Sequence, residues 1–282
     1  MAVVHDQARG RPSALARLLG APRYEVIPVD GVAEKVAALP AGVVVTVTAS
    51  PAHGIERTVA VSEDLAARGY RVVPHLAARM VEGRSRLEDV VERLAAAGID
   101  EAFVVGGDAS PSAGPYHAAA DLLEDIVTRR HPFTRLGVAG YPEGHPLISD
   151  GLLIDALRRK QAYATHIVTQ LCFDAGALVD WLRALRTSGV GLPVLVGLPG
   201  VVERRKLAEI SLKTGVGVSL RYLRRHGRQA LVLTRSRRYD PTSLAREVAA
   251  HLDDAGLGIV GAHLFTFNQV EATRDWVRRA AA

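Results

Sequence analysis

Short, valine-rich apolar runs alternate with amphipathic stretches along nearly the whole chain, and this alternation limits the possible folds more than any other feature. Many of the runs are continuously apolar, as parallel strands buried on both faces must be. We expect eight strands, at residues 24–28, 43–48, 72–76, 102–105, 136–141, 166–171, 193–197 and 260–267. Eight strand–helix repeats predict an α/β fold of the (β/α)₈ TIM-barrel class.

Helical patterns fill most of the gaps between the expected strands. They cover residues 85–97, 116–130, 147–163, 176–188 and 201–214. An open doubly wound sheet is the alternative arrangement, but no Gly-x-Gly-x-x-Gly motif stands between a strand and a helix. The sequence therefore favours a single barrel domain over residues 1–282.

Two segments exceed what a minimal barrel needs. Residues 1–22 are expected to be an N-terminal extension with a short helix. Residues 215–257 are expected to be an insertion before the eighth strand, with an apolar run at 229–234 and a helical pattern at 242–255. We interpret the insertion as an enlarged seventh βα unit.

Composition points to an ordinary globular protein of the cytoplasm. The chain is 48% hydrophobic and 23% charged, and its one cysteine, Cys172, excludes an internal disulfide. A single thiol is typical of a reducing compartment. The N-terminus has charged residues and no long apolar run, so no signal peptide is expected. No stretch approaches the ~20 apolar residues that cross a bilayer, so no membrane partner is expected.

The charge balance favours an anionic small molecule over nucleic acid. Thirty-five basic and 30 acidic residues give a net charge of +5. Aromatic residues make up only 5% and do not interleave with the basic ones, so a nucleic-acid partner is not expected. One basic cluster is either a solvated face or a binding surface for phosphate or carboxylate groups. It contains Arg221, Arg224, Arg225, Arg228, Arg235, Arg237 and Arg238.

Polar side chains follow at least seven of the expected strands, at the end of a barrel where active sites lie. Glu25 stands inside a strand-like run, where an unpaired carboxylate is costly. Each candidate could instead have a structural role: Asp108 can cap a helix or a turn, His75 can be a core histidine, and Glu56 can be the acid favoured in a helix's first turn. The histidines lack metal-ligand spacing on any one element, so no metal site is expected.

Seven motifs, in order along the chain, resemble those of the methylenetetrahydrofolate reductase family. They are YEVIP, VTVTASPAHGIERT, PHLAAR, VVGGD, GYPEGHP, IVTQLCFD and HLFTFN. GYPEGHP is similar to the family's Ala-Tyr-Pro-Glu-x-His-Pro and is the most specific of them. The resemblance implies an oxidoreductase of one-carbon metabolism and methionine biosynthesis. Such an enzyme reduces 5,10-methylenetetrahydrofolate with hydride from NADH or NADPH, and NADH is favoured.

The resemblance also implies roles for particular residues. Glu25 would be the general acid that protonates the departing nitrogen, and Asp108 would stabilise the iminium cation. Glu56 completes the implied catalytic set. Folate contacts are implied for Gln170, Phe267 and Thr48, with Tyr141 and Phe173 as further walls for the flat ring. Cofactor contacts are implied for His75, Tyr141, His145 and Arg159.

Two departures from the family pattern concern flavin. The family's arginine before Gly-Asp is Gly106 here, and residues 152–157 are mostly apolar where the family places polar groups along the flavin's tail. Each lost charge-assisted hydrogen bond is worth roughly 1.5–3 kcal/mol, so we expect FAD to be absent or weakly held. The alternatives are an FAD-dependent reductase, a non-catalytic folate-binding barrel that partners a methyltransferase, or another barrel enzyme such as a lyase. The sequence leaves the oligomeric state open.

Overall fold

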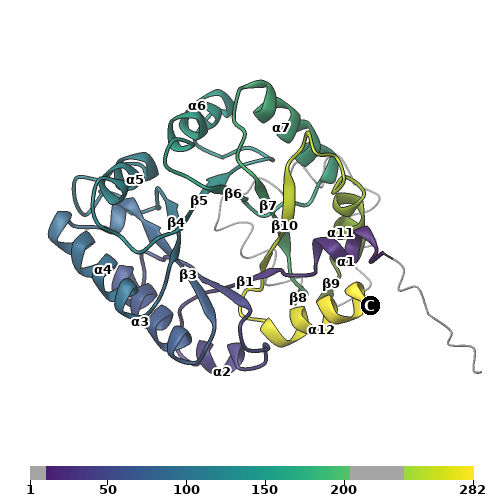
Figure 1. Cartoon of the computed structure of the whole chain (residues 1–282), viewed down its shortest axis with the longest axis horizontal. Helices are drawn as coiled ribbons and strands as arrows, with labels where there is room; N and C mark the ends of the chain where they lie inside the picture. The colour runs from purple at the N-terminus through teal and green to yellow at the C-terminus, as the bar shows by residue number, and fades with distance from the viewer. Residues whose placement is uncertain (1–10, 204–237) are drawn as a thin grey trace, which may run out of the picture.

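A closed barrel of eight parallel strands is the centre of the molecule. The computed structural model describes residues 11–203 and 238–282. The strand order around the barrel is β1-β10-β7-β6-β5-β4-β3-β2, and each neighbouring pair is parallel. Figure 1 looks along the barrel and shows the helices arranged around it. The predicted (β/α)₈ fold class is confirmed.

Each barrel strand overlaps the apolar run that predicted it. The strands are β1 (Arg23–Val26), β2 (Val44–Val47), β3 (Arg71–Ala77), β4 (Glu101–Val105), β5 (Arg135–Gly140), β6 (His166–Thr169), β7 (Val194–Pro199) and β10 (Ile259–Phe265). The register places Glu25 on β1 beside Phe265 on β10 and Thr46 on β2. Closure of the barrel therefore places its first strand, β1, beside its last strand, β10.

Helices connect successive strands and cover the outside of the barrel (Figure 1). They are α1 (Ala14–Leu18), α2 (Val32–Val36), α3 (Gly54–Ala67), α4 (Arg84–Ala96), α5 (Ala119–Val127), α6 (Asp150–Lys160), α7 (Ala175–Thr187), α11 (Thr242–Ala249) and α12 (Val270–Ala281), with a 3₁₀ turn η1 (Ala78–Met80). Among the helices of residues 11–203 and 238–282, none is long and apolar enough to span a bilayer.

The helical pattern predicted at 201–214 is wrong at its start. Residues Val202–Glu203 form β8, which pairs antiparallel with β9 (Arg238–Tyr239). Valine suits a strand, and the partner β9, distant in the sequence, supplies the backbone hydrogen bonds. The rest of that pattern, the apolar run at 229–234 and all of the arginine cluster except Arg238 lie outside the described residues.

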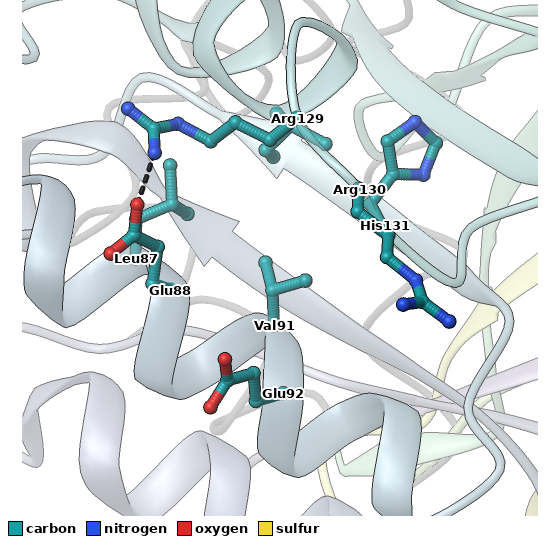
Figure 2. A pocket seen from close by; sticks show the side chains of 8 residues that line it. Leu87, Glu88, Val91, Glu92, Arg129, Arg130 and His131 are labelled. Carbon is teal, nitrogen blue, oxygen red and sulfur yellow. Dashed lines mark hydrogen bonds and ion pairs between the residues drawn. The ribbon is translucent and has the colours of Figure 1, made fainter.

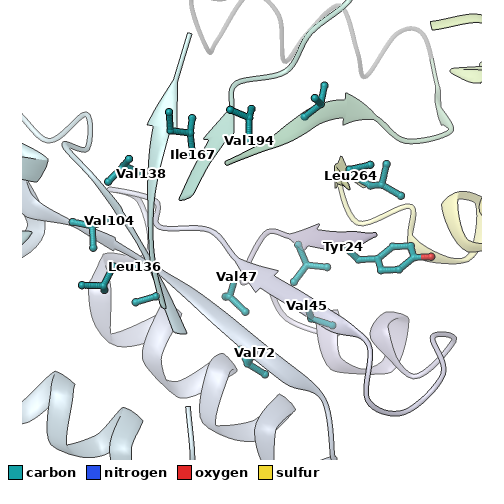
Figure 3. Packing of buried hydrophobic residues seen from close by; sticks show 14 of the residues in the cluster. Tyr24, Val45, Val47, Val72, Val104, Leu136, Val138, Ile167, Val194 and Leu264 are labelled. Atoms are coloured by element: carbon teal, nitrogen blue, oxygen red, sulfur yellow. The ribbon is translucent and has the colours of Figure 1, made fainter. Parts of the chain in front are cut away.

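Alternate residues of the strands pack into two different cores. The larger core contains Tyr24, Val45 and Val72, and Figure 3 shows these side chains on neighbouring strands. A second, smaller core inside the barrel contains Val73 and Phe103 with Val168 and Leu195. Val72 and Val73 are consecutive but belong to different cores, so the alternation identifies which residues of a strand face the barrel interior. Tyr24 and Val26 both belong to the larger, outer core, and the side chain of Glu25 between them therefore faces the interior.

Buried charges close the barrel at the N-terminal ends of its strands. Arg23 pairs with Glu101 at 2.5 Å, and the Nε2 atom of His166 lies 3.3 Å from the same carboxylate. Burial, with Arg23 and Arg135 nearby, lowers the pKa of His166 to about 3, so this ring is neutral at pH 7. Removing one partner of a buried ion pair typically costs about 3–5 kcal/mol. This end of the barrel therefore stabilises the fold, and the opposite end is left for a site.

Candidate functional site

The carboxylate of Glu25 lies inside the barrel between two histidines. Its Oε2 atom is 3.0 Å from Nε2 of His263 on β10 and 3.8 Å from Nε2 of His75 on β3. The Glu25 side chain is 12% exposed, whereas that of His263 is 1% exposed. The predicted acid is thus a nearly buried carboxylate with one hydrogen-bond partner and a second imidazole close by.

Burial keeps His75 neutral beside this carboxylate. Burial lowers the pKa of His75 to about 4, although the charge of Glu25 acts in the opposite direction. The ring packs against Phe103 with centroids 4.6 Å apart. Within the described residues, the Nε2 atom of His75 has no hydrogen-bond partner, and neither do Oγ1 of Thr46 and Nδ1 of His263. Buried polar atoms without partners are uncommon, and three of the four among the described residues belong to side chains of the barrel near Glu25, the fourth being Nδ1 of His131, so this part of the barrel is a candidate site.

The segment after β10 fixes the end of β1. Thr266 donates its hydroxyl to the Glu25 carbonyl at 2.6 Å. The Asn268 side chain accepts from the Ile27 N–H at 2.8 Å and donates to the Ile27 carbonyl at 3.0 Å. Phe267 and Asn268 have φ values of 49° and 61°, in the left-handed region that non-glycine residues rarely adopt. Such conformations persist where the surroundings hold them, and they cluster at functional sites.

An aromatic cluster lies at the C-terminal ends of β6, β7 and β10. Phe265 and Phe267 are stacked with centroids 6.4 Å apart, and Phe173 meets Tyr239 edge-on at 5.8 Å. Leu171 and Val202 complete the cluster. Two of the predicted wall residues, Phe173 and Phe267, therefore belong to the same aromatic cluster.

Gly197 on β7 makes room for this cluster. A Cβ atom at this position would lie 2.7 Å from Cε2 of Phe265 and 2.3 Å from the Thr169 carbonyl oxygen. Gln170 follows Thr169, and its Oε1 accepts from the Leu171 N–H at 2.8 Å. Thr48, at the end of β2, is half-buried and accepts a hydrogen bond from Thr58 through its carbonyl at 3.0 Å.

Tyr141, His145 and Asp108 form a second group, on the loops after β5 and β4. The rings of Tyr141 and His145 meet edge-on at 5.1 Å. Burial raises the pKa of Tyr141, and the negative charge of Asp108 adds to the effect. Asp108 itself is exposed, and in the described part of the chain no hydrogen bond or ion pair joins it to Glu25.

Glu143 ties the loop after β5 to the loop after β6. Its Oε1 atom accepts from the N–H groups of Phe173 at 2.5 Å and Asp174 at 3.1 Å. Asp174 in turn caps α7 by accepting from the Ala177 N–H at 2.9 Å. The acid in the GYPEGHP motif therefore holds backbone in place beside the aromatic cluster.

The structure does not bring Glu56 or Arg159 to Glu25. Glu56 is exposed on α3, where Arg86 and Arg93 of α4 bind its two carboxylate oxygens. The hydrogen bond from Arg86, followed by that from Arg93, lowers the pKa of this carboxyl. Its position in the first turn of α3 agrees with the alternative considered above, an acid favoured by the helix dipole. Arg159 is exposed on α6.

Apolar side chains near α6 and a glycine, Gly106, occupy positions where the family resemblance implies polar contacts with flavin. The large apolar side chains of Leu147, Ile148 and Leu152 are 89%, 41% and 63% exposed. Gly106, in place of the family's arginine, has open space around its Cβ position. These four positions therefore offer no charged side chain to a cofactor's phosphates, whereas Arg159 on α6 remains exposed. Among residues 11–203 and 238–282, no group of three His, Cys, Asp or Glu side chains is arranged to hold a metal ion.

A cavity of about 350 Å³ opens between α4 and α5, outside the barrel. Figure 2 shows Glu88 paired with Arg129 at one side of it, with Val91 and Glu92 on α4 nearby. None of the predicted site residues lines this cavity. The candidate site is therefore the barrel end around Glu25, and not this surface cavity.

Sequence analysis did not assign roles to His263, Thr266 or Asn268. All three lie in the HLFTFN motif, residues 263–268. Because alternate residues share one face of a strand, the inward position of Phe265 also places His263 inside the barrel. The alternation of inward and outward side chains along the strand could therefore have identified His263 from the sequence. The contacts of Thr266 and Asn268 depend on the register between β1 and β10.

Comparisons with known proteins agree with the motifs. A family model described as methylenetetrahydrofolate reductase matches residues 29–280. Methylenetetrahydrofolate reductase 2 of Saccharomyces cerevisiae is 27% identical over 125 residues, 40% of this chain and 21% of that protein. Methylenetetrahydrofolate reductase (NADH) 1 of Arabidopsis thaliana is 27% identical over 131 residues, 40% of this chain and 22% of that protein. The matched part thus spans about a fifth of these curated relatives.

A solved structure also shares the fold. It is an uncharacterized protein from Clostridium thermocellum, described as binding two copies of 5-methyl-5,6,7,8-tetrahydrofolic acid. The two chains superpose with a TM-score of 0.63 at 15% identity, over 95% of this chain and 96% of the other. At this identity the likeness shows the fold alone.

Proposed function

This chain belongs to the methylenetetrahydrofolate reductase family, and from that premise we propose that it reduces 5,10-methylenetetrahydrofolate to 5-methyltetrahydrofolate. The hydride donor in this proposal is a reduced nicotinamide dinucleotide. NADH is favoured over NADPH because the plant relatives that match the chain carry NADH in their names.

The observation that carries the proposal is the nearly buried carboxylate of Glu25 between His263 and His75. In the reaction, the bond between the methylene carbon and one folate nitrogen breaks, and its electron pair stays on that nitrogen. Glu25 supplies the proton that this nitrogen takes. The methylene carbon becomes part of an iminium cation with the other nitrogen, and hydride from the nicotinamide then adds to the carbon.

The remaining site residues support binding and orientation. The aromatic cluster with Phe265 and Phe267 offers a surface for the flat pterin ring, and Gln170 offers an amide for its polar edge. We assign Asp108 to stabilisation of the cation and assign contacts with the nicotinamide dinucleotide to Tyr141 and His145. Glu56 is left outside the proposed site because Arg86 and Arg93 bind its carboxylate, whereas Arg159, exposed on α6, stays assigned to contact with the nicotinamide dinucleotide.

We also propose that hydride passes directly from the nicotinamide to folate. The support is the apolar surface of Leu147, Ile148 and Leu152, together with Gly106 where the family has arginine. A cofactor with a phosphate tail gains little from exposed apolar side chains. No step of the proposed reaction therefore involves flavin.

A folate-binding barrel without reductase chemistry is the second candidate. The clostridial structure favours it, because that protein is described as binding two copies of a methylated folate. The two candidates differ in what they require of Glu25: a reductase needs an acid directed into the site, and a simple binding protein does not.

The test is an incubation of the purified chain with 5,10-methylenetetrahydrofolate and NADH. We expect NADH to be oxidised and 5-methyltetrahydrofolate to form in equal amounts, measured by absorbance and by chromatography. Folate binding by calorimetry without any NADH oxidation would support the second candidate. The absence of both folate binding and NADH oxidation would contradict both candidates.

A further inference from the structure

We propose that His263 is the positioning residue of Glu25: it donates its Nε2–H to Oε2, which fixes this oxygen and leaves Oε1 to carry the proton toward the substrate. This inference rests on the proposed reductase function. The contact between Glu25 on β1 and His263 on β10 joins residues that lie 238 positions apart in the sequence.

The geometry makes His263 the hydrogen-bond partner of Oε2 among the described residues. Its Nε2 lies 3.0 Å from Oε2, an ordinary hydrogen-bond length. Nε2 of His75 is 3.8 Å from the same oxygen, which is too long for a hydrogen bond. Since burial keeps His75 neutral, that ring adds no positive charge beside the carboxylate.

The surroundings of the two side chains indicate which nitrogen of His263 donates and which oxygen of Glu25 faces the substrate. Nε2 of His263 faces Oε2, whereas Nδ1 of His263 has no partner in the described structure. A ring that carries its hydrogen on Nε2 therefore forms the observed contact by donating to Oε2. Because both imidazoles face Oε2, Oε1 is the oxygen that remains for the substrate.

Packing prevents the His263 ring from turning away. The side chain is 1% exposed, and Phe265 meets its ring edge-on with centroids 5.0 Å apart. The titratable side chains that face Glu25 are therefore His263 from β10 and His75 from β3, with the hydroxyl of Thr46 beside it on β2.

The hydrogen bond becomes stronger as the reaction proceeds. When Glu25 gives up its proton, it becomes a carboxylate in a nearly buried place. A hydrogen bond to an ionised oxygen is about twice as strong as one to a neutral oxygen. His263 therefore stabilises the transition state more than the bound substrate, and its loss should lower kcat more than it raises KM.

The experiment compares two variants of the whole chain. His263→Met keeps a similar apolar bulk and removes the donor, whereas His263→Gln keeps an N–H. Circular dichroism checks that both fold. We expect His263→Met to lower kcat for methylenetetrahydrofolate reduction about 10–100-fold, with little change in the folate KM, because one charge-assisted hydrogen bond is lost. His263→Gln should recover most of that loss, and in a Glu25→Gln background His263→Met should have almost no further effect.

Three results would overturn the inference while the wild type remains active. They are undiminished turnover in folded His263→Met, an equal loss in His263→Gln, or an undiminished effect of His263→Met in the Glu25→Gln background. If His263→Met does not fold, the ¹⁵N resonances of the His263 ring in the wild type and in Glu25→Gln decide. The pairing predicts that the Nε2–H signal moves, and a signal that stays in place contradicts it. A wild type that does not reduce methylenetetrahydrofolate contradicts the proposed function, and the resonance measurement still tests the pairing.

Discussion

Glu25 and His263 meet inside the barrel, with Oε2 of the carboxylate 3.0 Å from Nε2 of the imidazole. The contact joins the first and the last strand of the barrel, β1 and β10, which are neighbours because the sheet is closed. In an open sheet with these strands at opposite edges, the carboxylate would have no such partner. The placement of the proposed acid is therefore a direct consequence of barrel closure.

Glu25→Gln is expected to lower kcat by roughly 10²–10⁴-fold, the usual size for a lost acid–base group. The amide keeps the shape of the side chain and cannot donate a proton of comparable acidity. Steady-state oxidation of NADH with methylenetetrahydrofolate measures the effect. Turnover close to that of the wild type would remove Glu25 from the acid role.

Asp108→Asn is expected to lower turnover about 10–100-fold while leaving the melting temperature nearly unchanged. Asp108 is exposed, so it contributes little to folding, and its charge reaches Tyr141 in the second group of site residues. Turnover and thermal melts on the same preparation separate the two effects. A variant that melts early but retains full turnover would show that Asp108 serves the loop only.

Acid is expected to destabilise the fold partly through His75. Its pKa falls to about 4 in the folded chain, while the unfolded chain keeps the ordinary value of about 6.5. The unfolded state therefore binds the proton first as the pH drops, and up to about 3 kcal/mol of stability is lost between pH 6.5 and pH 4.

The matching variant is His75→Leu, measured by urea unfolding at several pH values. Removal of the imidazole should flatten the decline of the unfolding free energy over this range. His166 acts in the same direction, because burial lowers its pKa to about 3, so part of the decline will remain. An identical pH dependence in the variant and the wild type would show that His75 contributes nothing to it.

Gly197→Ala is expected to destabilise the fold by about 1–3 kcal/mol and to raise the KM for folate. The added Cβ would lie 2.7 Å from the Phe265 ring and 2.3 Å from the Thr169 carbonyl oxygen, so the aromatic cluster must shift. Gly191→Ala is the matched control, because a Cβ at that position meets nothing within 4 Å. If both variants behave like the wild type in unfolding and in KM, the cluster does not depend on Gly197.

The fold could be predicted because barrel strands carry their signal locally. The apolar runs are short and several are rich in valine, and the repetition of eight such units leaves few architectures. The prediction that Glu25 and His75 lie toward the C-terminal ends of their strands followed from the same reasoning. The start of the 201–214 pattern was different, because β8 forms against a partner in β9 that no local pattern reveals.

Contacts between distant residues explain what sequence analysis did not find. The role of His263 depends on the register between β1 and β10. The position of Glu56 depends on two arginines of α4, which bind its carboxylate at the surface. A motif can thus place an acid near a strand end without showing which side chains will bind it.

In the proposed reaction, hydride passes directly from the nicotinamide to folate in the barrel around Glu25. The most direct test uses NADH that carries deuterium at the transferring position, with methylenetetrahydrofolate and the chain purified without added flavin. Direct transfer predicts one deuterium in the methyl group of the product, detected by mass spectrometry. Transfer through a flavin would place the hydride on a nitrogen that exchanges with water, so an active enzyme that forms product without deuterium would contradict the claim.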